Sequence, residues 1–246
     1  MTSSTLFLGW QDKEHRQWFP VGRLDAEVDP RIYRFRYVGG AERARDEAGF
    51  PPLYEFPDFL KDYRSRELFP LFTNRVIAPT RPDRSEYLRN LDLTDEADPV
   101  EILAVNGGRR TTDLYEVFPK IKKRNDGSFT YKFFVHGTRY VPPESSRRTD
   151  RLIVGEKLNL TLELTNPVSR VAVQIQTEDY HMIGWSPRYL VDDLVAAMAE
   201  SPFYSATVVR VNPQPTPSKQ RVLVQLEGQW KNHTPMNGDD FQPLVE

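Results

Sequence analysis

The sequence of 246 residues contains no cysteine, and histidine is scarce. Without cysteine the chain has no disulfide bond, no thiol nucleophile and no cysteine-ligated zinc site, which fits a reducing cytoplasm. No two histidines have the spacing of metal ligands. Long apolar runs are missing too, and the first residues lack the basic start and apolar core of a secretory leader. We therefore predict a cytoplasmic protein with no cofactor, no bound metal and no membrane association.

The sequence also lacks the motifs of common catalytic classes. No Gly-x-Ser-x-Gly elbow of a serine hydrolase occurs. The glycine-rich run 107–112 lacks the spacing and the lysine of a P-loop, so we interpret it as a helix end followed by a turn. Each of the acidic pairs Asp192-Asp193 and Asp239-Asp240 consists of neighbours whose side chains diverge on a regular element. We expect a protein that is not an enzyme, although a nuclease site built from distant acidic residues stays open.

Charge of one sign is not in excess overall, but it is unevenly distributed. The formal charge of the chain is −2. Residues 1–119 carry 17 basic and 21 acidic side chains, whereas residues 120–188 carry 12 basic and 7 acidic ones. The cationic excess of the second segment is compatible with contacts to phosphate groups. With 39% hydrophobic and 12% aromatic residues, the chain can build one large or two small cores.

Residues 151–199 hold the most informative pattern of the chain. Alternating leucines predict a half-buried strand over 158–164, and a second strand follows over 171–175 after an Asn-Pro turn. A third short strand ends at Trp185. A Ser-Pro pair then predicts the N-cap and the first residue of a helix over 187–200.

This segment resembles the HIRAN domain, a small OB-like β module, over residues 133–228. The motifs that carry the resemblance are Arg139-Tyr140, Leu162-Glu163-Leu164, Asn166-Pro167, Ala172-Val173 and Ile183-Gly184. The resemblance implies binding of nucleic acid, in the best understood members the unpaired 3′ end of a DNA strand. At Val168-Ser169 the end-binding members carry Tyr-Asp, so the carboxylate that accepts the terminal hydroxyl proton is missing. Trp185 replaces a polar residue or a histidine of that pattern.

The candidate nucleic-acid contacts are basic and aromatic side chains on and around this module. Arginine binds phosphate through paired donors, and an aromatic ring stacks on a base. The strand predicted over 131–140 ends at an Arg-Tyr pair and is followed by an arginine-rich loop, and the N-terminus of the predicted helix favours an anion. A further basic stretch follows the proline-rich loop 212–217. The predicted contacts are Arg139, Tyr140, Arg147, Arg148, Arg151, Arg170, Trp185, Arg188, Tyr189, Lys219 and Arg221.

Each of these residues also has an ordinary structural explanation. Arginine and lysine mostly cover solvated surface or protect an exposed edge strand. Tyr140 could be a half-buried strand residue, and Trp185 and Tyr189 could pack the helix onto the sheet. The basic cluster at 120–124 fits a solvated linker as well as it fits a phosphate contact.

The first half of the sequence predicts a separate domain of strands and helices. Alternation predicts a hairpin over 5–24 and a third strand over 32–37, closed by a Gly-Gly pair and followed by a charged link. The spacing of apolar residues predicts helices over 58–72, 86–91 and 99–105. The last of these begins with an Asp-Pro pair, the signature of an N-cap and a first helical residue.

This half resembles the N-terminal subdomain of HipA-type proteins over residues 6–118. The motifs are Val21-Gly22-Arg23-Leu24, the strand 33–37, the run 67–72 and Gly107-Gly108. The kinase body that follows in that family is missing from this sequence, since no catalytic or metal-binding aspartate loop comes after it. The resemblance therefore implies a domain for protein contacts rather than a phosphotransferase.

Together these patterns predict an α+β protein. Residues 1–118 form a small sheet with helices, 119–132 a basic linker, and 133–246 an OB-like β-barrel with one helix. The first hypothesis is a non-enzymatic bacterial accessory protein. Its HIRAN-like domain binds single-stranded or end-containing DNA, and its N-terminal domain binds a helicase, a nuclease, or defence or mobile-element machinery. The alternative is a protein-interaction subunit of a toxin–antitoxin-like or effector complex that does not bind nucleic acid itself.

Overall fold

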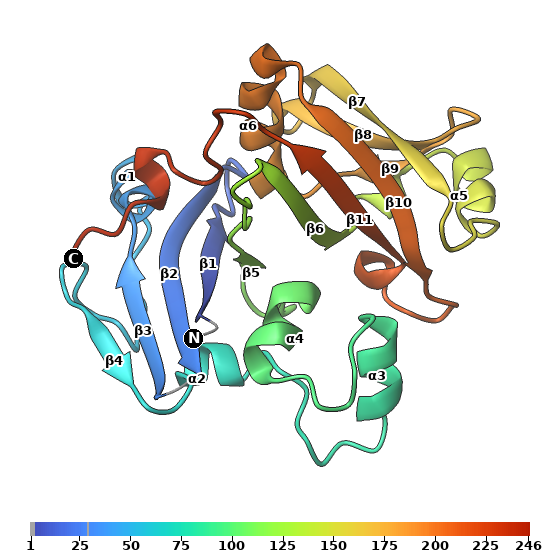
Figure 1. The fold of residues 1–246 in the computed structure, drawn as a ribbon. Helices are drawn as coiled ribbons and strands as arrows, with labels where there is room; N and C mark the ends of the chain where they lie inside the picture. Colours follow the sequence, from blue (N-terminus) through green and yellow to red (C-terminus); the bar gives the residue numbers. More distant parts are fainter. Residues whose placement is uncertain (1–2, 29) are drawn as a thin grey trace. The chain divides into compact units, whose positions relative to one another are not determined.

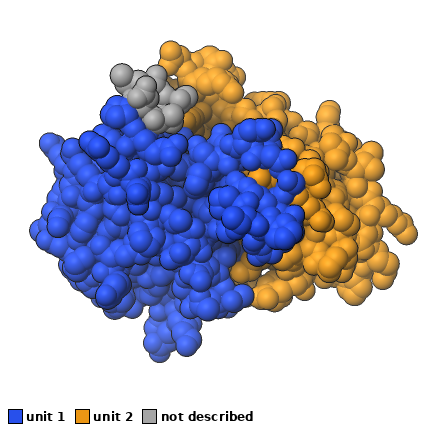
Figure 2. Space-filling model, turned by 90° about the horizontal axis from the view of Figure 1, so that it is seen from below, with its two compact units in different colours: residues 1–85, 94–120, 236–246 blue, residues 86–93, 121–235 orange. Residues whose placement is uncertain are grey.

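The computed structural model describes residues 3–28 and 30–246, and these residues form two antiparallel sheets and six α-helices (Figure 1). Contacts divide the chain into two compact units (Figure 2). The first unit contains residues 1–85, 94–120 and 236–246, and the second contains residues 86–93 and 121–235. Because compactness does not test independent folding, the domain limits inferred from the sequence stay a prediction.

The five-stranded sheet of the first unit has the order β4-β3-β2-β1-β5. Its strands are β1 (Ser3–Gln11), β2 (Trp18–Val28), β3 (Arg31–Tyr37), β4 (Tyr63–Ser65) and β5 (Tyr115–Pro119). The hairpin and the third strand expected from alternation are confirmed. Successive residues of a strand point to opposite faces, so each strand contributes alternate side chains to the core.

Aromatic side chains fill the core on one face of this sheet. Phe35 of β3 stacks on Phe56 with ring centroids 3.9 Å apart. Tyr37 donates its hydroxyl to the carbonyl oxygen of Phe56 at 2.7 Å. Phe56 precedes a stretch of irregular chain, β4 and the short helix α2 (Pro70–Thr73), so the long helix predicted over 58–72 is wrong. The aromatic residues there follow the contour of the core rather than one face of a helix.

The charged link expected after β3 is instead helix α1 (Gly39–Ala48), so the Gly-Gly pair begins a helix rather than ending a strand. Ala41 and Ala44 of this helix are fully buried. The helix approaches β2 so closely that a Cβ atom at Gly40 would lie 2.1 Å from the carbonyl oxygen of Pro20. Small residues therefore define the buried side of α1.

The two later helices of the first half are confirmed as α3 (Arg84–Asn90) and α4 (Pro99–Asn106). Asp98 caps α4 in a capping box, since its carboxylate accepts from the main chain of Glu101 and the Glu101 carboxylate accepts from the Asp98 N–H. Gly107 ends the helix in the left-handed conformation, with φ of 73°. The sequence signature of this helix therefore predicted where it begins and where it ends.

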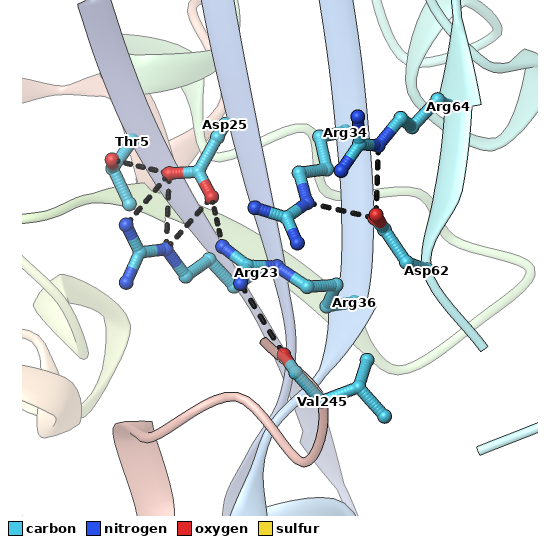
Figure 3. A network of polar contacts seen from close by, with 8 residues as sticks. All are labelled: Thr5, Arg23, Asp25, Arg34, Arg36, Asp62, Arg64 and Val245. Carbon is cyan, nitrogen blue, oxygen red and sulfur yellow. Dashed lines mark hydrogen bonds and ion pairs between the residues drawn. The ribbon is translucent and has the colours of Figure 1, made fainter. Parts of the chain in front are cut away.

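The second face of the first sheet carries a network of polar side chains (Figure 3), beside the buried ring of Phe7. Asp25 accepts hydrogen bonds from Thr5 at 2.7 Å and from Arg36 at 2.8 Å. Asp62 accepts one from Arg34 at 2.7 Å. Burial raises the pKa of both carboxyls, but the arginine hydrogen bonds outweigh it and leave both pKa values below their usual range. The arginines of this face therefore have internal counter-ions.

Residues 236–246 return to the first unit and include the short turn η4 (Asp239–Phe241). The phenylalanine of η4 contacts Phe7 of β1, with ring centroids 4.9 Å apart. The N–H of Leu244 donates to the carbonyl oxygen of Tyr37 at 3.0 Å. The end of the described chain thus belongs to the same core as its first strand.

The six-stranded sheet of the second unit has the order β6-β11-β10-β7-β8-β9. Its strands are β6 (Ser128–Phe134), β7 (Lys157–Asn166), β8 (Arg170–Thr177), β9 (Met182–Trp185), β10 (Phe203–Val211) and β11 (Val222–Gln229). The helical elements are η1 (Thr138–Tyr140), α5 (Pro143–Thr149), α6 (Arg188–Ala196), η2 (Ala197–Glu200) and η3 (Ser218–Gln220). The strand, turn, strand and helix order predicted over 151–199 is confirmed.

The predicted closed β-barrel is wrong. β7 pairs with β10 only through Leu158 and the residue before it, within the described chain. The outer strands β6 and β9 are joined beyond the end of β6 by the single bridge between His136 and Trp185, whose two N–H to C=O bonds are both 2.9 Å long. Because pairing between β7 and β10 stops early, the strands form an open sheet rather than a continuous hydrogen-bonded cylinder.

Candidate nucleic-acid interface

The sequence predicted Arg139 and Tyr140 at the end of a long strand, but they lie on the short turn η1. β6 ends at Phe134, and Gly137 then adopts φ of 70°, which lets the chain turn away from the sheet. Thr138 holds the turn by donating its hydroxyl to the carbonyl oxygen of Ser218 at 3.1 Å. The Arg-Tyr pair is thereby raised onto the surface.

The two side chains of this turn form a stacked pair. The guanidinium carbon of Arg139 lies 4.6 Å from the centroid of the Tyr140 ring, and its Nη2 donates to the Tyr140 hydroxyl. Tyr140 is 63% exposed, so the other face of its ring is open to solvent. A cation beside an exposed ring is an arrangement that can hold a nucleotide by its phosphate and its base.

The arginine-rich loop expected after this turn is helix α5, which begins at Pro143 and lies against β9. Arg147 and Arg151 are exposed, and neither side chain has an ion pair in the described part of the chain. Arg148 differs, because it donates to Asp179 at 3.0 Å and also to Glu156. Arg147 on α5 and Arg151 just after it are therefore exposed cations without an ion pair in the described residues, whereas Arg148 on α5 is held by two carboxylates.

The Arg148 ion pairs have a clear electrostatic signature. The Arg148 guanidinium is the main cause that lowers the pKa of Asp179 to about 2. In turn, Asp179 and then Glu156 raise the pKa of Arg148 above its ordinary value. Because a phosphate would have to displace both carboxylates, the structure does not favour Arg148 as a nucleic-acid contact.

The turn η3 brings a further basic pair to the same end of the sheet. Lys219 lies on η3, which is beside η1, as the bond from Thr138 to Ser218 requires. Arg221 follows and donates to Asp150 at 2.6 Å, just after α5, so its charge is already balanced. Lys219 is the exposed member of the pair.

Trp185 connects the Arg-Tyr turn to the sheet. Its indole N–H donates to the Glu163 carboxylate at 2.6 Å. A Cβ atom at Gly137 would lie 2.5 Å from the Trp185 ring, so the ring fits closely beneath the turn. Burial raises the pKa of Glu163, but hydrogen bonds from Trp185 and Asn166 outweigh it and lower that pKa. Trp185 thus supports η1, and Glu163 is its partner that sequence reasoning missed.

The start of α6 differs from the expected anion site. The helix begins at Arg188, and Pro187 stands at the N-cap without a side-chain cap. Tyr189 is 9% exposed and lies edge-on to the buried Tyr131 ring, with centroids 6.4 Å apart. Arg188 is half-buried. Tyr189 is therefore a core aromatic residue, and a base has no access to its ring.

Arg170 lies at the tip of the β7–β8 hairpin, apart from the other predicted contacts, with φ of 64°. Asn166 forms this turn by accepting from the N–H groups of Val168 and Ser169, at 3.0 and 3.1 Å. Val168 is 56% exposed. No carboxylate stands in this turn, as the sequence had indicated.

Five of the predicted residues therefore lie exposed around one end of the second sheet. We call this the η1–α5–η3 surface, and it consists of Arg139, Tyr140, Arg147, Arg151 and Lys219. Ile153 and Val154, 68% and 69% exposed, follow α5 directly and add an apolar margin that the sequence analysis did not include. An exposed ring among exposed cations can bind a single strand by stacking and by phosphate contacts.

Two features were sought among the described residues, a cluster of metal-binding side chains and a membrane-spanning helix. No group of three or more histidine, cysteine, aspartate or glutamate side chains that could hold a metal ion occurs among them. In the same part of the chain no helix is long and apolar enough to cross a membrane.

Comparison with known proteins identifies the second half. Residues 128–231 match the family model of the HIRAN domain, and this segment is a HIRAN domain. HIRAN domains are modules that bind DNA ends and single-stranded DNA. The match gives no support to the resemblance of the first half to HipA-type proteins, which stays a prediction. No curated protein matches the chain.

Two solved structures are similar to this chain. One is a protein from Lactobacillus plantarum, 21% identical, which covers 43% of this chain and 100% of its own, with a TM-score of 0.34. The other is the HIRAN domain of human HLTF, 15% identical, with 44% of this chain and 81% of that chain covered and a TM-score of 0.31.

Proposed function

We propose that this chain binds single-stranded or end-containing DNA through its HIRAN domain and has no enzymatic activity of its own. The observation that carries the proposal is the stacked Arg139–Tyr140 pair on an exposed turn, with Arg147, Arg151 and Lys219 around it. The ring supplies one stacking platform, and the cations supply phosphate contacts whose strength falls as salt rises.

The recognised feature is the strand rather than its terminal hydroxyl. The β7–β8 turn carries Val168 and Ser169, and Asn166 uses its side-chain oxygen to hold the turn. No carboxylate is therefore available there to accept a proton from a 3′ hydroxyl. A strand with a blocked 3′ end should bind as tightly as one with a free end.

The first unit is the proposed contact for a protein partner, such as a helicase, a nuclease, or defence or mobile-element machinery. In this role the chain is an adaptor that positions its partner on DNA. The arginines in the polar network of the first sheet already have internal counter-ions. They are therefore not part of the proposed DNA contact.

A fluorescence-anisotropy titration with a labelled single strand tests the proposal at low and at physiological salt. Combined replacement of Arg139, Tyr140 and Arg147 by alanine should weaken binding strongly and reduce its salt dependence. The matched control replaces Arg45 and Arg110, exposed arginines of the first unit, and should leave affinity unchanged. Equal affinity of wild type and triple variant would show that the surface is wrongly assigned.

The alternative function is a protein-interaction subunit without nucleic-acid binding. The observation in its favour is the tip of the β7–β8 hairpin, where Leu164 and Val168 are 66% and 56% exposed. Exposed apolar side chains at a hairpin tip fit a protein contact better than a phosphate backbone. Absence of any binding to single strands at low salt would favour this function.

A further inference from the structure

A short segment of the first half of the chain belongs to the second unit. Residues 86–93, the end of α3 and the turn after it, lie with the HIRAN domain. Leu88 and Leu91 are fully buried. The carbonyl oxygen of Asn90 accepts a hydrogen bond from the side-chain amide of the buried Asn212 at 2.9 Å. The segment is therefore anchored just before its acidic residue, Asp92.

Asp92 directs its carboxylate at two cations of the HIRAN sheet. One carboxylate oxygen lies 2.7 Å from Nζ of Lys132 on β6, and the other lies 3.3 Å from Nη2 of Arg210 on β10. β11 runs between these strands. Two cations from separate strands thus converge on a single carboxylate, and the left-handed backbone of Asp92, with φ of 59°, places it there.

The positive charges of Lys132 and Arg210 are only partly neutralised by Asp92. Two positive charges face one negative charge, and Nε of Arg210 is buried without a hydrogen-bond partner in the described structure. The side chains of Lys132 and Arg210 are each 36% exposed, so solvent reaches the group. Burial raises the pKa of Asp92, but Lys132 and Arg210 outweigh it and lower that pKa, so the carboxylate is charged at neutral pH.

The group lies at the same end of the sheet as the proposed DNA contacts. Arg210 is close to the end of β10, and Asn212 just beyond it donates its N–H to the carbonyl oxygen of Arg221 at 2.8 Å. The side chain of Asn212 also donates to the carbonyl oxygen of Gln220 in η3, at 2.7 Å. The next residue back along η3 is Lys219 of the η1–α5–η3 surface.

We propose that Lys132 and Arg210 form a second phosphate-binding site of the HIRAN domain, and that the Asp92 carboxylate occupies it as an internal stand-in for a phosphate group. This inference rests on the proposed DNA binding. The carboxylate oxygens take the positions that two phosphate oxygens would take, and lysine and arginine are the side chains that bind phosphate best. The first half of the chain thus limits the affinity of the HIRAN domain for DNA.

The test compares Asp92→Asn with Asp95→Asn in the full chain. Both variants remove one negative charge, but Asp95 is exposed and has no ion pair in the described residues. Asparagine tolerates the left-handed backbone, so Asp92→Asn should keep the fold, and thermal melting checks this. Titrations of a labelled single strand across a salt series give the affinity and its salt slope for each variant.

Asp92→Asn should bind about 3- to 10-fold more tightly at low salt, because two cations become available to the strand. Its salt slope should steepen by about 0.7 for each further phosphate group that the protein neutralises, up to about 1.4. Asp95→Asn should change neither quantity beyond a small general charge effect. Adding Lys132→Ala and Arg210→Ala to Asp92→Asn should return the slope to that of the wild type.

Equal behaviour of Asp92→Asn and Asp95→Asn, with a wild type that binds, would overturn this inference and leave the proposed function standing. Failure of the wild type and of both variants to bind would overturn the proposed function and this inference with it. If the triple variant kept the steeper slope, the additional phosphate groups would bind elsewhere, and the assignment of Lys132 and Arg210 would be wrong.

Discussion

Replacement of Tyr140 by alanine should weaken binding to a single DNA strand while leaving its salt dependence unchanged. The ring is 63% exposed, and the Arg139 guanidinium, 4.6 Å from its centroid, covers one face. One face is therefore left for one base. A single base stacked on an aromatic side chain contributes about 1–3 kcal/mol, so the dissociation constant should rise by about 5- to 150-fold.

The salt series separates this effect from that of the neighbouring cation. Tyr140→Ala removes no charge, so the slope of log affinity against log salt should stay that of the wild type. Arg139→Ala should instead reduce the slope by about 0.7, the value for one phosphate contact with a single strand. The two substitutions thus report on stacking and on phosphate contact independently.

Tyr54→Ala is the matched control. Tyr54 is a fully exposed tyrosine of the first unit, at 101% of the reference exposure, so its loss should not change DNA affinity. Fluorescence anisotropy with an oligonucleotide of fixed length gives all the constants. If Tyr140→Ala and Tyr54→Ala bound DNA equally, the ring would have no stacking role and the reasoning would be refuted.

Three further predictions concern stability. Gly137→Ala should destabilise the fold more than Gly155→Ala in urea unfolding: both residues have positive φ, which costs about 1–2 kcal/mol, but only Gly137 also meets a ring, at 2.5 Å, while nothing lies within 4 Å of Gly155. Equal losses would show that the ring can move aside. Because the pKa of Asp179 falls from 3.8 to about 2 beside Arg148, this pair stabilises the protein above about pH 4 and loses its effect as pH falls through about 2. The difference in melting temperature between wild type and Arg148→Ala should shrink over that window, and a constant difference would contradict the assignment. Asp98→Ala should cost about 1 kcal/mol by the loss of the N-cap, measured by chemical denaturation, whereas no change would mean that water replaces the cap.

Elements that are specified by residues close together in the sequence were predicted correctly. Alternating leucines indicated β7, and the Asp98-Pro99 pair indicated the start of α4. Segments whose path is set by packing against the core were not predicted correctly. The aromatic residues between Phe56 and Phe72 have a helical spacing by chance, because they fill an irregular path around Phe35. Periodicity cannot separate these cases, since it contains no information on the partner surface.

The sequence predicted which residue types form the candidate site, but not which of the cations already have an ion pair within the protein. Arg148 and Arg147 are adjacent in sequence, yet the first is bound by Asp179 and Glu156, whereas the second has no ion pair in the described residues. The counter-ions of Arg148 lie 31 and 8 residues away along the chain. Asp92 shows the same principle, since its cations come from strands far along the sequence. Tertiary ion pairs decide which cations remain for a ligand, and single-sequence patterns do not record them.

The division of the chain has a consequence for synthesis on the ribosome. Residues 236–246 complete the first unit, whose other parts are made before the HIRAN domain. The aromatic packing of Phe241 on Phe7 and the bond from Leu244 to Tyr37 therefore cannot form until the whole HIRAN domain has been translated. The first unit is therefore incomplete until residues 236–246, which follow the HIRAN domain in the chain, have been made. A stop codon placed just after residue 235 would keep every strand of both sheets. It would still remove the segment 236–246 from the first unit.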